Sequence, residues 1–360
     1  MRKDDKTLVI LTPAFPANES ETYWIPFMQL MVKSLKKNFP ELNIIVLTFQ
    51  YPGLESTYRW NDVRVISFDG MHKKKFRRIL LWRKIWTTLK NIHREHKIIG
   101  MFSAWCGECA FIGKYFAKKK SLEHISWICG QDALKTNKWV RFIRPRAKQL
   151  AAMSPYLVKE FSKNHGIKPA HIIPNAIDPL IFSPTSHPGR KIDILGAGSL
   201  VALKQYDLFV EVIAAVKKSL PTVRALHCGD GDEKEKIELL IKKLELEENL
   251  ELLGSKKHEE VIALMQQTKL FLHTSSFEGF GAVCLEALYA GAHVISFHYP
   301  LDHPVPHWHV AADKKEMASK ALEILKNQNT DHSQVLVYSM DDSAKTLMKL
   351  FGIEAINRIQ

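Results

Sequence analysis

Residues 270–296 read LFLHTSSFEGFGAVCLEALYAGAHVIS. The segment opens with an apolar run at 270–274 that predicts a buried strand, and residues 282–289 have the composition of a helix. Glu278 stands between them beside two glycines, and a second apolar run follows at 292–296. A strand, a glycine-containing turn, a helix and another strand predict one βαβ unit of a parallel sheet.

The rest of the chain repeats this alternation in two halves. The first half predicts strands at 7–12, 43–49, 63–68, 98–102 and 124–128, with helices at 25–35 and 109–118. The second predicts strands at 192–195, 223–228, 250–253, 270–274 and 292–296, with helices at 206–219, 233–246, 258–266 and 282–289. We therefore expect an α/β protein of two doubly wound domains that face each other.

The domain boundaries follow from composition. The stretch 182–190 (FSPTSHPGR) carries proline and glycine and is predicted to link domains at 1–181 and 191–335. The last segment, 336–360, is expected to form a helix that crosses back to the N-terminal domain.

The composition excludes several classes of protein. The 360 residues are 46% hydrophobic and 25% charged, which is ordinary globular composition. No apolar run approaches the roughly 18 residues that span a bilayer, the N-terminal run is too short for a signal peptide, and five cysteines are too few for a disulfide framework. A cytoplasmic protein is expected.

The net charge of +13 is unevenly placed. Residues 1–180 hold 31 basic and 14 acidic residues, or +17, whereas residues 181–360 are at −4. The basic half is expected to meet an anionic partner: a nucleic acid, a membrane surface or a phosphorylated substrate.

Glycines that follow strands are the first candidates for a ligand site. Gly198 and Ser199 follow the strand at 192–195 and precede Lys204, and Gly229 and Gly231 close the next strand. Small residues at a helix start let backbone amides approach an anion, and a lysine adds a point charge for phosphate. The alternative interpretation, at 198–199 and at 229–231, is an ordinary turn between a strand and a helix that binds no ligand.

Two carboxylates eight residues apart make the segment at 270–296 more specific. Glu278 lies at the strand–helix turn, and Glu286 lies on a helix that is otherwise apolar. Because an unpaired buried carboxylate is costly, Glu286 must reach a polar crevice or a buried partner. Carboxylates beside a phosphate-type turn suit a polyhydroxylated ligand with an anionic centre.

This segment resembles the E-x7-E signature of retaining glycosyltransferases of family 4, which have the GT-B fold. Further segments are similar to that family: 171–178 (HIIPNAID), 198–204 (GSLVALK), 229–231 (GDG) and, near the start, 15–22 (FPANESET). Three departures stand out: Ser199 replaces the usual arginine, Cys129 replaces a histidine before Asp132, and the usual GGxxE is absent.

The resemblance implies specific roles. The second domain would bind a nucleotide-diphosphate sugar, with Glu286 on the ribose, Lys204 on the diphosphate, and Glu278 with Gly279, Phe280 and Gly281 on the transferred sugar. The catalytic residues would be Glu278, Lys204 and Asp132, and the donor would also contact Gly198, Ser199, Gly229 and Gly231. No metal or cofactor is expected. The acceptor would be lipid-linked or a growing polysaccharide of the cell surface.

Residues 72–97 combine basic and aromatic side chains at helical spacing. A basic face opposite an apolar one is typical of a helix at an anionic membrane surface. The residues assigned to that surface or to the acceptor are Lys73, Lys74, Lys75, Arg77, Arg78, Trp82, Arg83 and Trp86. A domain helix with a solvated basic face is the alternative. We expect a peripheral protein on the inner face of the plasma membrane.

Other interpretations stay open. A sugar-nucleotide epimerase or a phosphorylase would share the fold, a nucleic-acid-binding protein would use the basic half, and a dehydrogenase is less favoured because Val201 replaces the third glycine of its fingerprint. Cys106 and Cys109 form a C-x-x-C motif. We interpret this spacing as a coincidence rather than as a zinc or redox site, because the sequence has neither a second such pair nor a thioredoxin-like context. His298, His303, His307 and His309 are read as an irregular exposed or substrate-lining loop rather than a metal site.

Overall fold

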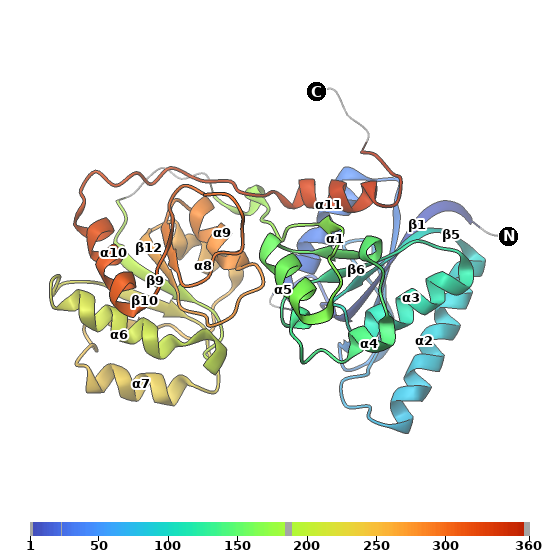
Figure 1. The fold of residues 1–360 in the computed structure, drawn as a ribbon, viewed down its shortest axis with the longest axis horizontal. Coiled ribbons are helices and arrows are strands. Elements are labelled where there is room, and N and C mark those ends of the chain that lie inside the picture. Colours follow the sequence, from blue (N-terminus) through green and yellow to red (C-terminus); the bar gives the residue numbers. More distant parts are fainter. Residues whose placement is uncertain (1–2, 23, 184–188, 356–360) are drawn as a thin grey trace. The chain divides into compact units, whose positions relative to one another are not determined.

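The structure, a computed structural model, describes residues 3–22, 24–183 and 189–355. The chain forms two compact units: unit 1 holds 1–176 and 340–360, and unit 2 holds 177–339 (Figure 1). Each unit has one sheet, parallel except for one edge strand of unit 1, with helices packed on it, so the predicted pair of doubly wound α/β domains is confirmed.

The sheet of unit 1 has the order β3-β4-β2-β1-β5-β6-β7-β8, and β3 alone runs antiparallel to its neighbour among the described strands. The strands are β1 (Lys3–Ala14), β2 (Asn43–Tyr51), β3 (Glu55–Trp60), β4 (Val63–Phe68), β5 (His96–Ala104), β6 (His124–Ile128), β7 (Leu150–Ala152) and β8 (His171–Ile172). The central strands β1 and β2 contain continuous apolar runs, at 8–11 and 44–47, because both faces of a parallel sheet are buried.

The helices of unit 1 include one from the far end of the chain. They are α1 (Pro26–Asn38), α2 (Phe76–Glu95), α3 (Glu108–Lys120), α4 (Trp139–Ile143), α5 (Pro155–His165) and α11 (Met340–Lys349). α11 packs on α1, where Asp341 accepts hydrogen bonds from Ser34, Lys37 and Asn38 at 2.6–2.9 Å. The chain thus returns to unit 1 at Met340.

Unit 2 has six parallel strands in the order β11-β10-β9-β12-β13-β14. The strands are β9 (Ile192–Ala197), β10 (Ala225–Cys228), β11 (Leu250–Leu252), β12 (Thr268–His273), β13 (His293–Ser296) and β14 (Trp308–Val310). The helices are α6 (Tyr206–Lys217), α7 (Lys234–Lys243), α8 (His258–Met265), α9 (Ala282–Tyr289) and α10 (Lys314–Lys326). The predicted elements of this half are confirmed within a few residues.

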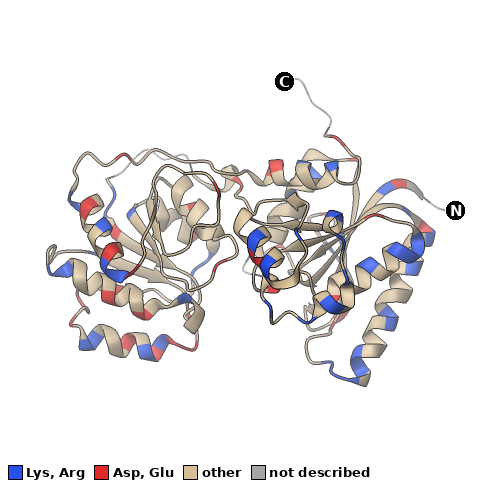
Figure 2. Cartoon of the chain, viewed as in Figure 1, with Lys and Arg blue, Asp and Glu red and all other residues tan. Residues whose placement is uncertain are grey.

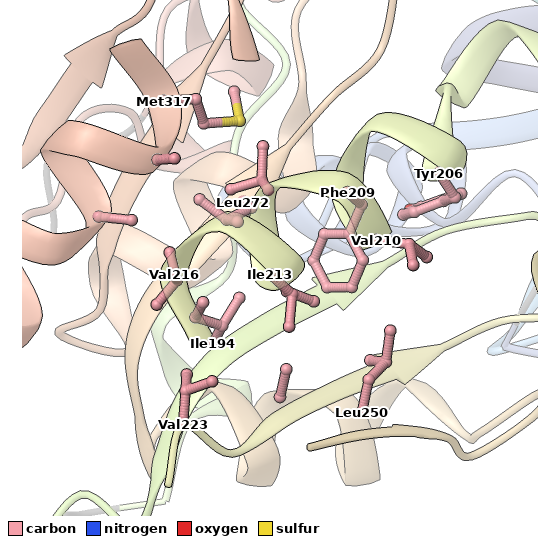
Figure 3. Packing of buried hydrophobic residues seen from close by; sticks show 14 of the residues in the cluster. Ile194, Tyr206, Phe209, Val210, Ile213, Val216, Val223, Leu250, Leu272 and Met317 are labelled. Carbon is pink, nitrogen blue, oxygen red and sulfur yellow. The ribbon is translucent and has the colours of Figure 1, made fainter. Parts of the chain in front are cut away.

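Both faces of the sheet in unit 2 are buried. On one face, residues of α6, α7 and α10 form a cluster with strand residues that include Leu270 and Ile295. Figure 3 shows part of this cluster, with Ile194 and Leu272 of the sheet beside Phe209 of α6. The alternate residues Leu195 and Phe271 are fully buried but lie outside this cluster, because successive strand residues point to opposite faces. Helices α8 and α9 contact β9, β12 and β13 on that second face.

The crossing between units lies earlier than the predicted linker at 182–190, so that boundary was wrong. Phe182 and Arg190, the two ends of that stretch, already pack on unit 2: Phe182 contacts Tyr289, and Arg190 donates to backbone carbonyls at Met265, Thr268 and Ala290. Those carbonyls include the ends of α8 and α9, where a cation is favoured. Residues 184–188 of the predicted linker and 356–360 of the predicted last segment lie outside the described residues.

Candidate functional site

The glycine turns of unit 2 meet at the carboxyl ends of three neighbouring strands. The Gly198 N–H donates to the Cys228 carbonyl at 2.9 Å, and the Gly229 N–H donates to the Gly254 carbonyl at 2.9 Å. Gly229 has φ +145°, and a Cβ there would lie 1.9 Å from the carbonyl oxygen of Gly198. Only glycine therefore allows the turns after β9 and β10 to pack backbone against backbone.

Lys204 and Glu278 form an ion pair beside these turns. Lys204 ends the 3₁₀ helix at Ala202–Lys204, and its Nζ lies 2.7 Å from Oε2 of Glu278. Thr274 and Ser276 donate hydrogen bonds to the carbonyls of Lys204 and Leu203, so the two loops are held together by their backbones. Residues that are 74 positions apart are thereby brought into contact.

The environment of Glu278 keeps its carboxylate ionised. Burial alone would raise the pKa of Glu278, but the contact with His273 and the charge of Lys204 outweigh it and lower that pKa to about 2. Nε2 of His273 lies 3.4 Å from the carboxylate, an electrostatic contact without the geometry of a hydrogen bond. The pKa of His273 itself is lowered, chiefly by burial.

Glu286 lies on α9, and its partner is a residue that we did not predict. Nε2 of His258, the first residue of α8, lies 2.8 Å from Oε1 of Glu286. A Cβ added at Gly281 would lie 3.4 Å from Cγ of Glu278 and 3.6 Å from Sγ of Cys284, and Glu286 follows Cys284 on α9. Burial raises the pKa of the Cys284 thiol, and the charges of Glu278 and Glu286 add to that. Glu278 and Glu286 thus belong to one locale.

Other residues that were predicted to contact the donor lie in the loops around Glu278 and the glycine turns. Gly281 precedes α9 with φ +73°, Phe280 is buried near Tyr338, and Ser199 is exposed in the turn after β9. The start of α9, which no side chain caps, offers backbone amides. The site combines a lysine, amides and two carboxylates, which suits phosphate and hydroxyl groups on one ligand.

Asp132, which we predicted to be catalytic, is bound by backbone amides of unit 1. Its Oδ2 accepts a hydrogen bond from the Cys106 N–H, and its Oδ1 accepts from the N–H groups of Cys129 and Gly130, at 2.8–3.0 Å. Burial raises its pKa, although these amides oppose the shift. Asp132 is buried in unit 1, where its carboxylate fixes the loop after β6.

The basic segment forms α2, but several of the residues assigned to the membrane or the acceptor turn inward. Arg78 and Trp82 both donate to Glu108 at the start of α3, and Trp86 packs on Phe116. These three side chains are half-buried rather than on the exposed face of α2. Glu108 draws Arg78 and Trp82 inward because a buried carboxylate needs partners. In the same segment, Lys73 contacts Glu55, Asp69 and the carbonyl of Phe68.

The other basic residues assigned to the membrane or the acceptor are exposed: Lys74, Lys75, Arg77 and Arg83. They lie with exposed Phe76, Ile79 and Leu80 around the first half of α2. Figure 2 shows lysine and arginine also along α3. The exposed set therefore differs from the predicted one in losing both tryptophans, Arg78 and Lys73.

The histidine-rich stretch is more ordered than the loop that we predicted. Its end forms β14, and the rings of His307 and His309 stack on His293 of β13 with centroids 4.5 and 5.4 Å away. Burial, with the neighbouring imidazoles, lowers the pKa of His293 to about 4. His298 contacts the carbonyl of Ser276 near the Glu278 site. Among the described residues, no three His, Cys, Asp or Glu side chains are arranged to hold a metal ion.

A cavity of about 720 Å³ lies at the opposite, amino ends of the strands of unit 2 and is lined in part by Arg190, Lys269 and His332. The basic side chains of Lys269 and Arg190 that line it already have partners within the protein. Lys269 contacts Asp193 at 2.8 Å, and Arg190 binds backbone carbonyls. The glycine turns, with Lys204, are the better candidate for an anionic ligand.

Comparison with known proteins supports this assignment of the site to unit 2. Residues 178–336 match the family described as glycosyl transferases group 1. Over 168 residues, the chain is 32% identical to a subunit of the phosphatidylinositol N-acetylglucosaminyltransferase of Arabidopsis thaliana, covering 46% of this chain and 38% of that protein. The chain thus spans less than half the length of that relative.

Two further likenesses extend over more of the chain. An uncharacterized glycosyltransferase of Methanocaldococcus jannaschii is 25% identical over 280 residues, covering 76% of this chain and 75% of that one. The crystal structure of Anabaena HepE in complex with UDP-glucose superposes with a TM-score of 0.68 at 16% identity, covering 94% of each chain. The fold is accordingly the GT-B fold.

Proposed function

We propose that this chain is a glycosyltransferase that binds a nucleotide-sugar donor in unit 2 and transfers its sugar to a lipid-linked or glycan acceptor. The observation that carries the proposal is the Lys204–Glu278 ion pair at the glycine turns, with Glu286 in the same locale. The group 1 match over 178–336 covers all of these residues.

The donor that we propose is a UDP-sugar, with UDP-N-acetylglucosamine the first to test. The Anabaena neighbour was crystallised with UDP-glucose, and the Arabidopsis relative is named for N-acetylglucosamine transfer. In this assignment Lys204 leaves Glu278 to contact the diphosphate, Glu286 accepts hydrogen bonds from the ribose, and Ser199, Gly198, Gly229 and Gly231 line the turns.

The proposed reaction needs charge stabilisation more than a protein nucleophile. The acceptor hydroxyl oxygen bonds to the anomeric carbon while the bond from that carbon to the phosphate oxygen breaks, and the acceptor proton passes to the leaving diphosphate. Lys204 and the amides before α9 stabilise the negative charge that develops on the diphosphate. Glu278 orients the sugar, and attack on the face of the departing group would retain the anomeric configuration.

The reaction is tested by following UDP release from UDP-N-acetylglucosamine, with and without lipid or glycan acceptors. We expect release that is stimulated by an acceptor, with an α-linked product in its NMR spectrum. Conversion to an epimeric nucleotide sugar would replace the proposal with an epimerase. Formation of a sugar 1-phosphate from a glycan and inorganic phosphate, without use of a nucleotide sugar, would replace it with a phosphorylase.

We also propose that the first half of α2 rests on an anionic membrane surface. Phe76, Ile79 and Leu80 are 69%, 52% and 46% exposed at i, i+3 and i+4 spacing, so they form one apolar face beside Lys75 and Arg77. Among the described residues, no helix is both long and apolar enough to cross a membrane. A peripheral attachment through this face would bring unit 1 to a lipid-linked acceptor.

Replacing Phe76, Ile79 and Leu80 together by serine should weaken binding to anionic vesicles on the order of tenfold or more, because the face that enters the interface is lost. Vesicle sedimentation at low salt measures this. Leu239→Ser on α7 of unit 2, where Leu239 is equally exposed, is the matched control and should bind like the unaltered chain. If the unaltered chain stays in the supernatant, the membrane proposal is wrong.

A further inference from the structure

His258 makes a contact that the proposed donor site would need. It is the first residue of α8, after Lys257, and α8 packs against α9. Its Nε2 lies 2.8 Å from Oε1 of Glu286, and the two side chains are 24% and 13% exposed. Such a short, largely buried contact between an imidazole and a carboxylate holds both groups in one orientation.

The contact with His258 uses only one of the two carboxylate oxygens of Glu286. Within the described part of the chain, His258 is the only side chain that hydrogen bonds Glu286, and Oε2 of Glu286 has no such bond. A glutamate on an exposed helix could adopt several rotamers, whereas this one is held at Oε1, and its Oε2 is left to accept hydrogen bonds from a ligand. Ligand binding then costs less conformational entropy.

We propose that His258 is a positioning residue that holds the Glu286 carboxylate in the orientation that accepts hydrogen bonds from the ribose of the nucleotide. The inference rests on the proposed function, since it assigns a purpose to the contact only if unit 2 binds a nucleoside diphosphate. His258 touches neither the sugar nor the reacting atoms in this role.

The charges around His258 set its dependence on pH. From α9 it faces Glu286, and from its own helix Glu259, while Glu260 binds the backbone of Lys257. Burial opposes protonation, but the hydrogen bond and the charge of Glu286 raise the pKa of His258 above its ordinary value of 6.5. The imidazolium is therefore present near pH 6.5 and is lost as pH rises through that raised pKa.

UDP should consequently bind more tightly at pH 6.5 than at pH 9. The charged imidazole orders Glu286 more strongly and adds a positive charge near an anionic ligand. His258→Gln keeps a neutral donor and should lower affinity for UDP by a few-fold, with a flatter pH profile. His258→Ala removes the donor and should lower affinity by about tenfold.

Calorimetric titration of UDP into the full chain at pH 6.5, 7.5 and 9 tests the proposal, with His171→Gln on β8 of unit 1 as the control. Comparing variants cancels the titration of UDP itself. Turnover should show a raised KM for the donor in His258→Ala with kcat within about twofold, and partial rescue in His258→Gln.

The outcomes separate the two claims. If the unaltered chain binds UDP and His258→Ala has the same affinity and pH profile, the role of His258 is overturned while the proposed function stands. If His258→Ala lowers kcat as much as kcat/KM, His258 acts in the transition state rather than as a positioning residue, and the inference fails. If no nucleoside diphosphate binds to the unaltered chain, both claims fail.

Discussion

Glu278→Gln should reduce turnover of the proposed donor on the order of a hundredfold to a thousandfold, while the chain stays folded. The carboxylate is the group that pairs with Lys204 and lies beside His273, so its neutral isostere removes the charge and keeps the shape. The measurement is kcat and KM for UDP release. Glu238→Gln, an exposed glutamate on α7, is the control and should match the unaltered chain.

The same substitution has a second, independent signature in stability. Because the folded state lowers the pKa of Glu278 to about 2, the ionised carboxylate stabilises unit 2 at pH values above its ordinary 4.5. That contribution is lost as pH falls from 4.5 toward 2. Glu278→Gln should therefore unfold more easily than the unaltered chain at pH 7 and approach it in acid. Unchanged turnover in this variant would show that Glu278 is not at the reacting centre.

Gly229→Ala should cause the largest structural effect. The added Cβ would lie 1.9 Å from the carbonyl oxygen of Gly198, and the backbone at φ +145° is one that L side chains rarely adopt. The contacted oxygen belongs to the backbone and cannot move aside as the end of a side chain could. The turns after β9 and β10 must therefore separate. We expect a cost of roughly 3 kcal/mol or more, together with loss of nucleotide binding.

Hydrogen exchange of peptides within 192–231 measures this effect locally, because two units need not unfold as one. The matched control is Gly189→Ala in the same unit, where an added Cβ would meet nothing within 4 Å. Exchange in Gly229→Ala should rise across β9 and β10 and stay unchanged in the control. Equal protection in both variants would contradict the close packing of these turns.

The grouping of Lys204 and Glu278 at the glycine turns could be predicted because its signals are local in sequence. Glu278 and the glycines beside it lie within one strand–turn–helix segment, and Lys204 ends the loop after the neighbouring strand. Parallel strands bring their carboxyl ends to one edge, so the juxtaposition follows from the order of elements alone.

The contacts between helices could not be predicted in this way. His258 reaches Glu286 across 28 residues, and Arg78 reaches Glu108 across 30, so each pairing depends on how two helices pack. The basic and aromatic spacing of α2 fits a membrane face and a buried face equally well. The structure divides these residues because Glu108 attracts Arg78 and Trp82.

A strand of polar residues was also not predicted. β3 reads ESTYRW, with alternating exposed and half-buried residues at the edge of its sheet, and so lacks the apolar run used to predict strands. The boundary between units was missed because proline and glycine at 182–190 suggested a linker, although Arg190 and Phe182 pack on unit 2.

Calorimetric titration of UDP into the unaltered chain and into Lys204→Ala tests the central claim most directly. We predict saturable binding to the unaltered chain and a loss of affinity of about tenfold to a hundredfold in Lys204→Ala, because that substitution removes the only lysine paired at the turn with Glu278 within the described residues. GDP and ADP serve as comparison ligands. Absence of binding by all three nucleotides, or equal affinity for UDP in both proteins, would contradict a nucleotide-sugar site at Lys204 and Glu278.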